Sequence, residues 1–418
     1  MLQPGRSRPL RVLVLSRNYP NNVMQVLGLW VRNVVRESSK SCELKVVSPV
    51  PYCPALPGLP DNYARFRRIE KRSWDGRIET LRPRMIVGPG STTFRMEWRL
   101  YLRAVRSTVD ALRRDFPFDL IHAQFAYPDG VAAACLGRRY DVPVVITEQN
   151  SWLPWMNDYA SVRGRSVWAV RQSACLIAIS ESVRSTVEHF VGQAANVAVI
   201  PNGVDASEFT LPDAASSRDP QQLLFVGAIR PVKGVDLLLR AMRILMDRGR
   251  SERLLLVGEA FYGRYQEEEL RLKKMVQDLG IGDRVQFAGK QLPPYLGMTM
   301  GRSAALILPS RIEALGMVLV EALACGTPVV ATRCGGPEEI VTDQVGVLVP
   351  PENPEALARG IEHVIDRHDA YDPRQLRAHA LDNFGLESVA ERVKQVYENA
   401  VAGHRRTAVP SHVANGRA

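Results

Sequence analysis

The segment Leu308–Pro337, LPSRIEALGMVLVEALACGTPVVATRCGGP, predicts one strand–helix–strand unit of a parallel sheet. An apolar run that ends at Pro309 has the composition of a buried strand. The residues MVLVEALA that follow are apolar helix formers, and the helix they predict stops at Gly326. A second apolar run, residues 328–331, then leads into the turn Gly335–Gly336. The predicted fold class is therefore α/β.

Two glutamates in this segment carry the predicted chemistry. Glu313 lies in the loop at the carboxyl end of the first strand, where open α/β sheets bind ligands, and Glu321 lies two turns into the helix. Eight helical residues span about 12 Å, and a helix N-terminus between two carboxylates is suited to phosphate. The amides concerned are those of Leu315, Gly316, Met317 and Val318. A nucleoside-diphosphate sugar fits this pattern; the alternative is two solvated helix residues that stand eight apart by chance.

The block P-S-x-x-E-x-x-G-x-x-x-x-E-A-x-A-x-G-x-P-V-V-A is complete from Pro309 to Ala331, and a Gly-Gly turn follows it. In this block the sequence closely resembles the family-4 retaining glycosyltransferases of the GT-B fold. The resemblance covers about residues 11–402, loosely in the first half and specifically in the second. It implies two Rossmann-like domains that face each other across a cleft, with a C-terminal helix that crosses back to the N-terminal domain.

The length of 418 residues is enough for two domains. We expect an N-terminal acceptor-binding domain at 1–205, a linker at 206–220, a nucleotide-sugar-binding domain at 221–384, the crossover helix at 385–402 and a disordered tail at 403–418. The six cysteines form no C-x-x-C pair, so neither a disulfide framework nor a metal site is expected. No apolar run reaches the length of a membrane-spanning helix, and we expect a cytoplasmic protein.

The net charge of +10 favours polyanionic partners. No nucleic-acid motif occurs, so we expect peripheral contact with an anionic membrane rather than nucleic acid. The segment 94–114 has an apolar helical face flanked by arginines. It is either a core-packing helix with a solvated basic side or a helix that contacts anionic lipid or a lipid-diphosphate acceptor. The apolar face comprises Phe94, Trp98, Tyr101, Leu102, Val105, Val109 and Leu112, and the flanking residues are Arg95, Arg99, Arg103, Arg106 and Arg113.

Short apolar runs in the N-terminal half predict a mostly parallel sheet. They are residues 11–16, 43–50, 119–123, 143–147, 174–180 and 197–201. A helix is expected to begin near Gly28, and the resemblance implies that Gly28 belongs to a loop close to the acceptor and the donor phosphates. Residues 51–93, rich in Pro and Arg, are expected to form a long irregular insertion that shapes the acceptor site.

Two strand ends in this half carry polar candidates. The stretch DLIHAQFAYPDGVAAA resembles a subgroup of the family in which a histidine pair marks the strand end; here the pair is His122 and Gln124. After the next strand, relatives frequently carry a histidine that touches the transferred sugar, and here that position is Gln149. Glutamine can donate a hydrogen bond to a sugar but cannot carry a proton near neutral pH. His122 is either a satisfied strand-end residue or a catalytic one.

The resemblance also implies cations for the donor diphosphate. Family members place an arginine directly after the first glycine of the second domain and a lysine five residues later; here Gly227 is followed by Ala228, and Lys233 occupies the lysine position. Arg230 is a candidate substitute for the arginine, since charge on a departing diphosphate needs cations in a dry site. The alternative is that both cations are solvated loop residues. By the same resemblance Lys290 and Leu292 border the nucleobase and Asn202 lies in the turn beside the cleft.

The activity implied by the resemblance is retaining transfer of a sugar from a nucleoside-diphosphate sugar to a glycan or lipid-linked acceptor, in bacterial envelope or exopolysaccharide synthesis. The sequence has no D-x-D pair, so neither a metal nor a cofactor is expected. Glu321 is expected to accept the ribose hydroxyls and Glu313 the sugar hydroxyls. Two alternatives stay open: a GT-B nucleotide-sugar epimerase, and a non-catalytic nucleotide-sugar-binding partner, which the departures at Gln149 and Ala228 favour. A dinucleotide-dependent oxidoreductase is set aside because no G-x-G-x-x-G follows the first strand.

Overall fold

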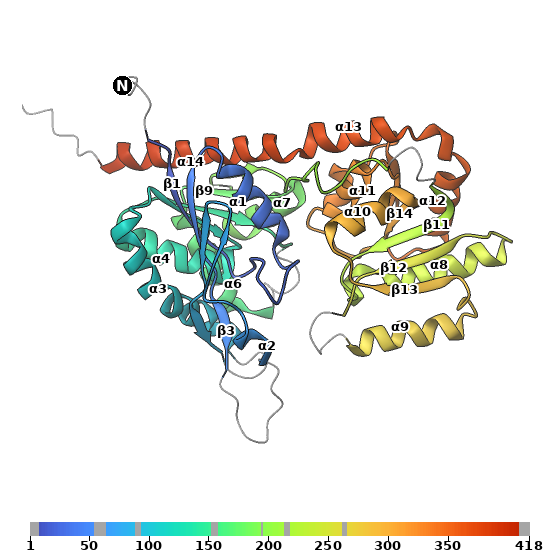
Figure 1. The fold of residues 1–418 in the computed structure, drawn as a ribbon, viewed down its shortest axis with the longest axis horizontal. Coiled ribbons are helices and arrows are strands. Elements are labelled where there is room, and N and C mark those ends of the chain that lie inside the picture. Colours follow the sequence, from blue (N-terminus) through green and yellow to red (C-terminus); the bar gives the residue numbers. More distant parts are fainter. Residues whose placement is uncertain are drawn as a thin grey trace, which may run out of the picture. The chain divides into compact units, whose positions relative to one another are not determined.

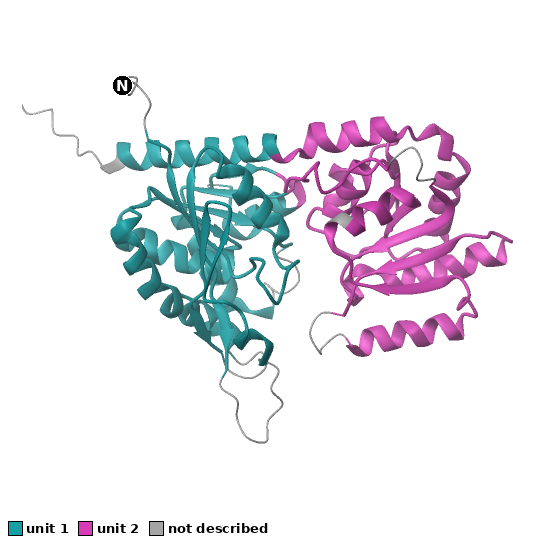
Figure 2. Ribbon diagram, viewed as in Figure 1, with its two compact units in different colours: residues 1–179, 183–200, 387–418 teal, residues 180–182, 201–386 magenta. Residues whose placement is uncertain are grey.

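A computed structural model describes residues 8–53, 64–87, 93–151, 158–193, 195–212, 218–260 and 266–408. The chain divides into two compact units, coloured teal and magenta in Figure 2. Unit 1 comprises residues 1–179, 183–200 and 387–418, and unit 2 comprises residues 180–182 and 201–386. None of the helices in the described ranges is long and apolar enough to cross a membrane.

Unit 1, whose strands β1, β3 and β9 are labelled in Figure 1, is built on a sheet described by its hydrogen bonding. This sheet has eight strands in the order β10-β9-β8-β7-β1-β2-β5-β4. Neighbouring strands are parallel except β4 and β5, and a separate pair is formed by β3 and β6. The strands are β1 (Arg11–Leu15), β2 (Glu43–Val47), β3 (Val50–Tyr52), β4 (Arg72–Asp75), β5 (Ile78–Leu81), β6 (Arg84–Ile86), β7 (Leu120–Gln124), β8 (Val144–Glu148), β9 (Cys175–Ala178) and β10 (Val197–Val199). All six strands that the apolar runs predicted are therefore present.

The helices and helical turns of unit 1 are α1 (Leu29–Ser38), α2 (Ala64–Arg67), η1 (Phe94–Met96), α3 (Glu97–Asp115), η2 (Ala126–Gly130), α4 (Val131–Tyr140), α6 (Ala160–Gln172), α7 (Glu181–Val191) and α14 (Leu386–Ala408), the last two of which begin with residues assigned to unit 2. Helix α14 brings the end of the chain back to unit 1. Its Val393 and Tyr397 are buried in one cluster with Val12 and Val14 of β1, so the helix completes the core of this unit.

The prediction that residues 51–93 form an irregular insertion is wrong. Strands β4 and β5 pair as an antiparallel hairpin with Asp75 opposite Ile78, and β5 extends the main sheet beside β2. The Asp-Gly dipeptide at the turn, with Gly76 at φ 57°, is a hairpin signal that the sequence analysis missed. Residues 54–63 and 88–92 of this segment lie outside the described residues.

Helix α3 packs on the sheet through the predicted apolar face. Tyr101, Val105, Val109 and Leu112 are buried, whereas Phe94 belongs to the preceding turn η1. The arginines at 95, 99, 103 and 106 are exposed. The core-packing interpretation therefore holds, and contact of the basic side with lipid stays a prediction.

Unit 2 contains a six-stranded, fully parallel sheet with the order β13-β12-β11-β14-β15-β16. The strands are β11 (Asp219–Val226), β12 (Arg253–Val257), β13 (Val285–Gly289), β14 (Ser303–Leu308), β15 (Val329–Thr332) and β16 (Gly346–Val349). The helices and turns are η3 (Pro231–Lys233), α8 (Val235–Asp247), α9 (Gln266–Asp278), α10 (Pro293–Arg302), α11 (Met317–Ala324), η4 (Gly336–Glu339), α12 (Pro354–Asp366), η5 (His368–Ala370) and α13 (Pro373–Phe384). The predicted unit β14–α11–β15 is present.

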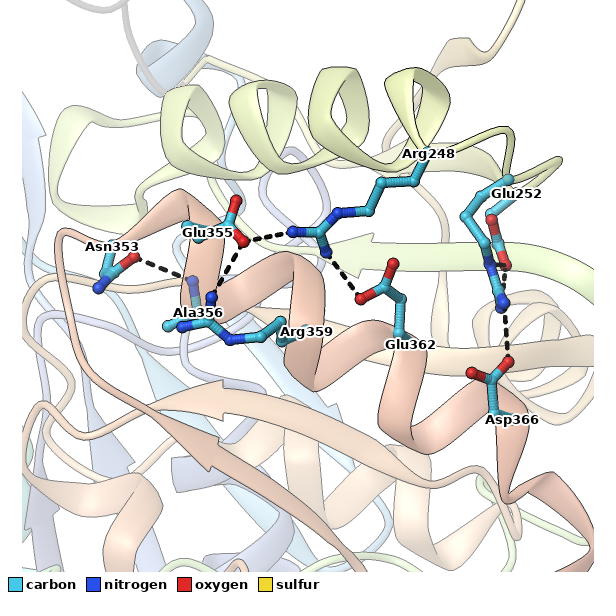
Figure 3. A network of polar contacts seen from close by, with 9 residues as sticks. Arg248, Glu252, Asn353, Glu355, Ala356, Arg359, Glu362 and Asp366 are labelled. Carbon is cyan, nitrogen blue, oxygen red and sulfur yellow. Dashed lines mark hydrogen bonds and ion pairs between the residues drawn. The ribbon is translucent and has the colours of Figure 1, made fainter.

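Ion pairs join α12 to the end of α8 and the following loop (Figure 3). Arg248 donates to Glu355 and, at 2.7 Å, to Glu362, and Arg250 donates to Asp366 at 2.8 Å. These side chains lie mostly at the surface, where ion pairs contribute little to stability.

The unit limits differ from the expected domain limits by a few residues. Unit 1 gives way to unit 2 after residue 200 rather than 205, and β11 begins inside the expected linker. Helix α14 continues to Ala408, past the expected end at 402, and its Ala400 and Val401 are still buried. The expected disordered tail therefore cannot begin at 403; its remaining residues, 409–418, lie outside the described part of the chain.

Candidate active site

The strand order of unit 2 reverses between β11 and β14. These two strands are neighbours, but the chain continues from β11 to β12 on one side and from β14 to β15 on the other. Ligands of open α/β sheets bind at the carboxyl ends of the strands at such a point. The two loops that start there are residues 227–234 after β11 and residues 309–316 after β14.

Glu313 and Lys233 meet between these loops. The Nζ of Lys233 donates to Oε2 of Glu313 at 2.6 Å, and the hydroxyl of Ser310 donates to the same oxygen at 3.0 Å. The side chain of Glu313 is 13% exposed and that of Lys233 22% exposed. A half-shielded ammonium, a group suited to phosphate, and a carboxylate, a group suited to hydroxyl donors, thus lie side by side at the strand-order reversal.

The main chain of Glu313 is fixed from the other side by the Gly335–Gly336 turn. The amide of Glu313 donates to the carbonyl of Cys334 at 3.3 Å, and the amide of Gly336 donates to the carbonyl of Glu313 at 2.9 Å. The predicted Gly-Gly turn therefore positions the loop that carries the carboxylate.

The remaining predicted residues of the β11 loop lie in different settings. Arg230 is exposed directly before the turn η3, whose last residue is Lys233. The amide of Gly227 donates to the carbonyl of Val257 at 3.0 Å, so this amide extends the sheet rather than pointing to a ligand. The structure thus brings Lys233, and not Gly227, to Glu313.

Helix α11 begins at the same place. Gly316 precedes it with φ 96°, Leu315 and Gly316 are buried, and Met317 and Val318 are half-buried. Among the described side chains none caps this helix start, and its first turn contains no acidic residue. An uncapped helix start is suited to an anion, and binding of the donor phosphates by these amides stays a prediction.

Glu321 is the fifth residue of α11, little more than one turn from its start and closer than the two turns expected from the sequence, and it is half-buried. Burial, and then the nearby carboxylate of Glu208, raise the pKa of Glu321 to about 7. Arg377 donates to the carbonyls of Ala324 at 2.6 Å and Ala206 at 3.0 Å, and so ties the segment that carries Glu208 to the end of α11. Glu321 therefore changes its charge near neutral pH.

The predicted nucleobase residues lie farther along the sheet. Lys290 and Leu292 are exposed after β13, which is separated from β11 by β12. Asn202 is buried near the start of the continuous part of unit 2.

Unit 1 has its own reversal of strand order, between β1 and β7. The loop after β1 folds back on itself at Gly28, whose φ is 73°. A Cβ at this position would lie 2.1 Å from the carbonyl oxygen of Asn18, so only glycine fits. The predicted loop of Gly28 is therefore at the carboxyl edge of the unit 1 sheet.

His122 is held on both sides of its ring. Its Nδ1 lies 2.7 Å from the hydroxyl of Tyr397 in α14, and its Nε2 lies 2.7 Å from the hydroxyl of Thr147. The amide nitrogen of Gln124 lies 3.3 Å from the same Nε2, and Gln149 donates to Oε1 of Gln124 at 3.0 Å. Because an amide nitrogen only donates, Nε2 accepts and the proton lies on Nδ1.

Burial lowers the pKa of His122 to about 3, so the ring is neutral at physiological pH. Its geometry is that of a strand-end residue with both ring nitrogens hydrogen-bonded, and Gln124 links the ring to Gln149.

A cluster of polar contacts around Asp129, at the carboxyl edge of the unit 1 sheet, was not predicted. The amide of Arg17 donates to Oδ1 of Asp129 at 2.7 Å, Tyr101 donates to the same oxygen at 3.1 Å, and the guanidinium of Arg17 pairs with Glu97 at 2.8 Å. Burial raises the pKa of Asp129 to about 8. The Asp-Gly turn after β7 marks Asp129 locally, but its partners stand 28 and 112 positions away in the sequence.

Sequence comparison identifies two family regions in the chain. Residues 207–379 match "Glycosyl transferases group 1", and residues 30–208 match "Glycosyltransferase Family 4". A D-inositol 3-phosphate glycosyltransferase from Acidothermus cellulolyticus is 30% identical over 358 residues, 79% of each chain. One from Mycobacteroides abscessus is 36% identical over 225 residues, 52% of this chain and 49% of the relative.

Solved structures share the fold. Sucrose-phosphate synthase from Thermosynechococcus elongatus superposes with a TM-score of 0.79 at 20% identity, over 94% of this chain and 100% of that one. The Anabaena protein HepE in complex with UDP-glucose has a TM-score of 0.69 at 19% identity, over 93% and 99% of the two chains. The predicted GT-B fold is thereby confirmed.

Proposed function

Because the chain belongs to the group 1 glycosyltransferases, with a family 4 N-terminal region, we propose that it moves a sugar from a nucleoside-diphosphate sugar to an anionic glycan or lipid-linked acceptor, with retention and without a metal. The observation that carries the proposal is the Lys233–Glu313 pair at the strand-order reversal of unit 2. The UDP-glucose complex of HepE supports a nucleotide-sugar donor. Two of the relatives are named for a phosphorylated substrate, D-inositol 3-phosphate, and this supports an anionic acceptor.

The donor spans the start of α11. Lys233 and the leading amides of α11 meet the diphosphate, and Arg230 supplies a second cation. Glu321 accepts the ribose hydroxyls and Glu313 those of the sugar. Lys233 is paired with Glu313 before the donor arrives, so the diphosphate competes for an ammonium that is already at the correct place.

The transfer step breaks the bond from the anomeric carbon to the diphosphate oxygen and forms the bond to the acceptor oxygen on the same face. The acceptor proton passes to the departing phosphate oxygen. His122, with its pKa lowered to about 3 by burial, is not a proton carrier here. It orients Gln124, and through it Gln149, which donates to the sugar.

The acceptor belongs to bacterial envelope or exopolysaccharide synthesis and is reached at the inner face of the membrane. The net charge of +10 and the exposed arginines along α3 support contact with an anionic surface. The protein acts from the cytoplasm as a peripheral enzyme.

The test is a donor-hydrolysis panel with EDTA present, run on the parent protein, Glu313→Ala and Glu321→Ala. We expect nucleotide release from one donor, unchanged by the chelator. Glu313→Ala should lower turnover by about 100-fold or more with donor affinity less affected than in Glu321→Ala. Equal turnover in all three proteins would refute the assignment.

If a donor raises the thermal midpoint but is not turned over even with a lipid-linked glycan extract, the protein is a non-catalytic binding partner. If the rate at which free nucleotide and sugar appear is not increased by adding the lipid-linked glycan extract, epimerase-type chemistry is favoured instead.

A further inference from the structure

Arg311 joins the two loops that meet at the strand-order reversal of unit 2. Its backbone amide donates to the carbonyl of Val232 at 2.8 Å, and its guanidinium donates to the carbonyl of Pro231 at 2.5 Å. Both acceptors lie in η3, the turn that ends with Lys233. Arg311 itself lies two residues before Glu313, so one residue of the Glu313 loop holds the Lys233 turn by its main chain and its side chain.

Two carboxylates, those of Asp236 and Glu352, bind the guanidinium of Arg311. Its NH1 and NH2 each donate to one oxygen of Asp236 at 2.9 Å, and its Nε lies 2.5 Å from Glu352. Asp236 belongs to the first turn of α8, directly after η3, and its side chain is 15% exposed. Hydrogen bonds to these carboxylates raise the pKa of Arg311, so it is charged throughout the working range.

Close packing makes the Lys233 turn sensitive to this anchor. Gly234, at φ 66°, follows Lys233, and a Cβ there would lie 2.0 Å from the carbonyl oxygen of Pro309. The turn therefore packs directly against the β14 loop, which also contacts it through Arg311 and through the Lys233–Glu313 pair. A planar fork is needed to hold Asp236 and the Pro231 carbonyl together, which a lysine ammonium cannot reproduce.

We propose that Arg311 is a positioning residue that fixes the Pro231–Lys233 turn, so that the Lys233 ammonium is already in place for the donor diphosphate. The identity of the ligand rests on the function proposed above; the placement of Lys233 does not. Arg311 acts through Lys233 and does not itself bind the donor, since its nitrogens are engaged with Asp236, Glu352 and Pro231.

The first measurement needs no donor. Trace acetylation with mass spectrometry reports how exposed each lysine ammonium is. In Arg311→Gln we expect the labelling rate of Lys233 to rise about fivefold, because the turn no longer holds the ammonium against Glu313. Lys290, exposed in the same unit, is the internal reference. Arg248→Gln is the matched control variant, because Arg248 also bridges two carboxylates, Glu355 and Glu362, away from the β11 loop (Figure 3). Equal labelling of Lys233 in Arg311→Gln, Arg248→Gln and the parent overturns the proposal.

The second measurement is a double-mutant cycle of donor affinity with UDP-glucose as the first probe. Arg311→Gln should weaken donor binding about tenfold, and Arg311→Lys about threefold, because lysine restores the charge but not the fork. In a Lys233→Ala background Arg311→Gln should weaken binding less than twofold further. A full tenfold loss in that background means that Arg311 acts without Lys233 and refutes the positioning role. If the parent binds no nucleotide sugar, the proposed function fails while the labelling result still decides the role of Arg311.

Discussion

Glu321 makes donor affinity depend on pH in a direction that the structure fixes. Burial and the carboxylate of Glu208 raise its pKa to about 7. A carboxyl with this pKa is about one tenth ionised at pH 6 and about nine tenths ionised at pH 8. If the ribose hydroxyls donate to the ionised form, the dissociation constant of the donor falls about tenfold between these two pH values.

The assay is isothermal titration calorimetry at half-unit steps from pH 6 to 8, with an intact nucleotide sugar. Its diester phosphates keep a constant charge over this range. Glu321→Gln should remove this tenfold change of the donor dissociation constant. Glu208→Gln should move the midpoint to lower pH, because the nearby negative charge is gone. His122 is neutral across the range and adds no pH dependence to donor affinity. Asp129 titrates near pH 8, and any pH dependence that it adds persists in Glu321→Gln, so the difference between this variant and the parent gives the contribution of Glu321.

The sign for stability is opposite. The folded state binds the Glu321 proton more tightly than the unfolded state does, so the fold loses stability as the pH rises from the ordinary carboxyl range through about 7. Glu321→Gln should therefore raise the thermal midpoint more at pH 8 than at pH 5. A parent dissociation constant that is flat from pH 6 to 8, or a change in Glu321→Gln as large as in the parent, would contradict the assigned contact between Glu321 and the ribose.

Further predictions concern the unit 1 edge. Gly28→Ala should lower the free energy of unfolding by about 2 kcal/mol or more, because its Cβ collides with Asn18. Gly76 is also at positive φ but has no described atom within 4 Å of a Cβ, so Gly76→Ala should cost about 1 kcal/mol. Equal losses of the two variants in urea melts would exclude the collision. Tyr397→Phe leaves Nδ1 of His122 buried without its hydroxyl partner and should cost about 1–3 kcal/mol, measured by the same melts; an unchanged midpoint would mean that this bond does not support the fold.

Much of unit 2 could be predicted from local sequence. The β14–α11–β15 unit is marked by apolar runs of the correct length and by glycines at each boundary, and these signals act within a few residues. The Glu313–Lys233 contact was predicted only as a shared donor site, because its partners stand 80 residues apart in the sequence. The contact exists because β11 and β14 are neighbours in the sheet, which no local pattern reports.

The unit 1 edge was predicted less well for the same reason. His122 lies 275 residues from Tyr397, and Arg17 lies 112 residues from Asp129. The first pair depends on the return of α14 to unit 1, and the second depends on the pairing of β1 with β7. The β4–β5 hairpin, in contrast, carried a local signal at Asp75–Gly76 that the composition of the surrounding segment obscured.

The return of α14 to unit 1 sets the order in which the protein can be completed on the ribosome. Unit 2 is almost continuous in sequence and has all its strands and helices once residue 386 has been synthesised. Unit 1 begins first, but Val389, Val393 and Tyr397, which share its core with Val12 and Val14, are added last. The part of its apolar sheet face that α14 covers therefore stays exposed throughout the synthesis of unit 2. The unit that starts the chain is the one that finishes folding last, and a nascent or truncated chain ending before α14 exposes that face to chaperones and to aggregation.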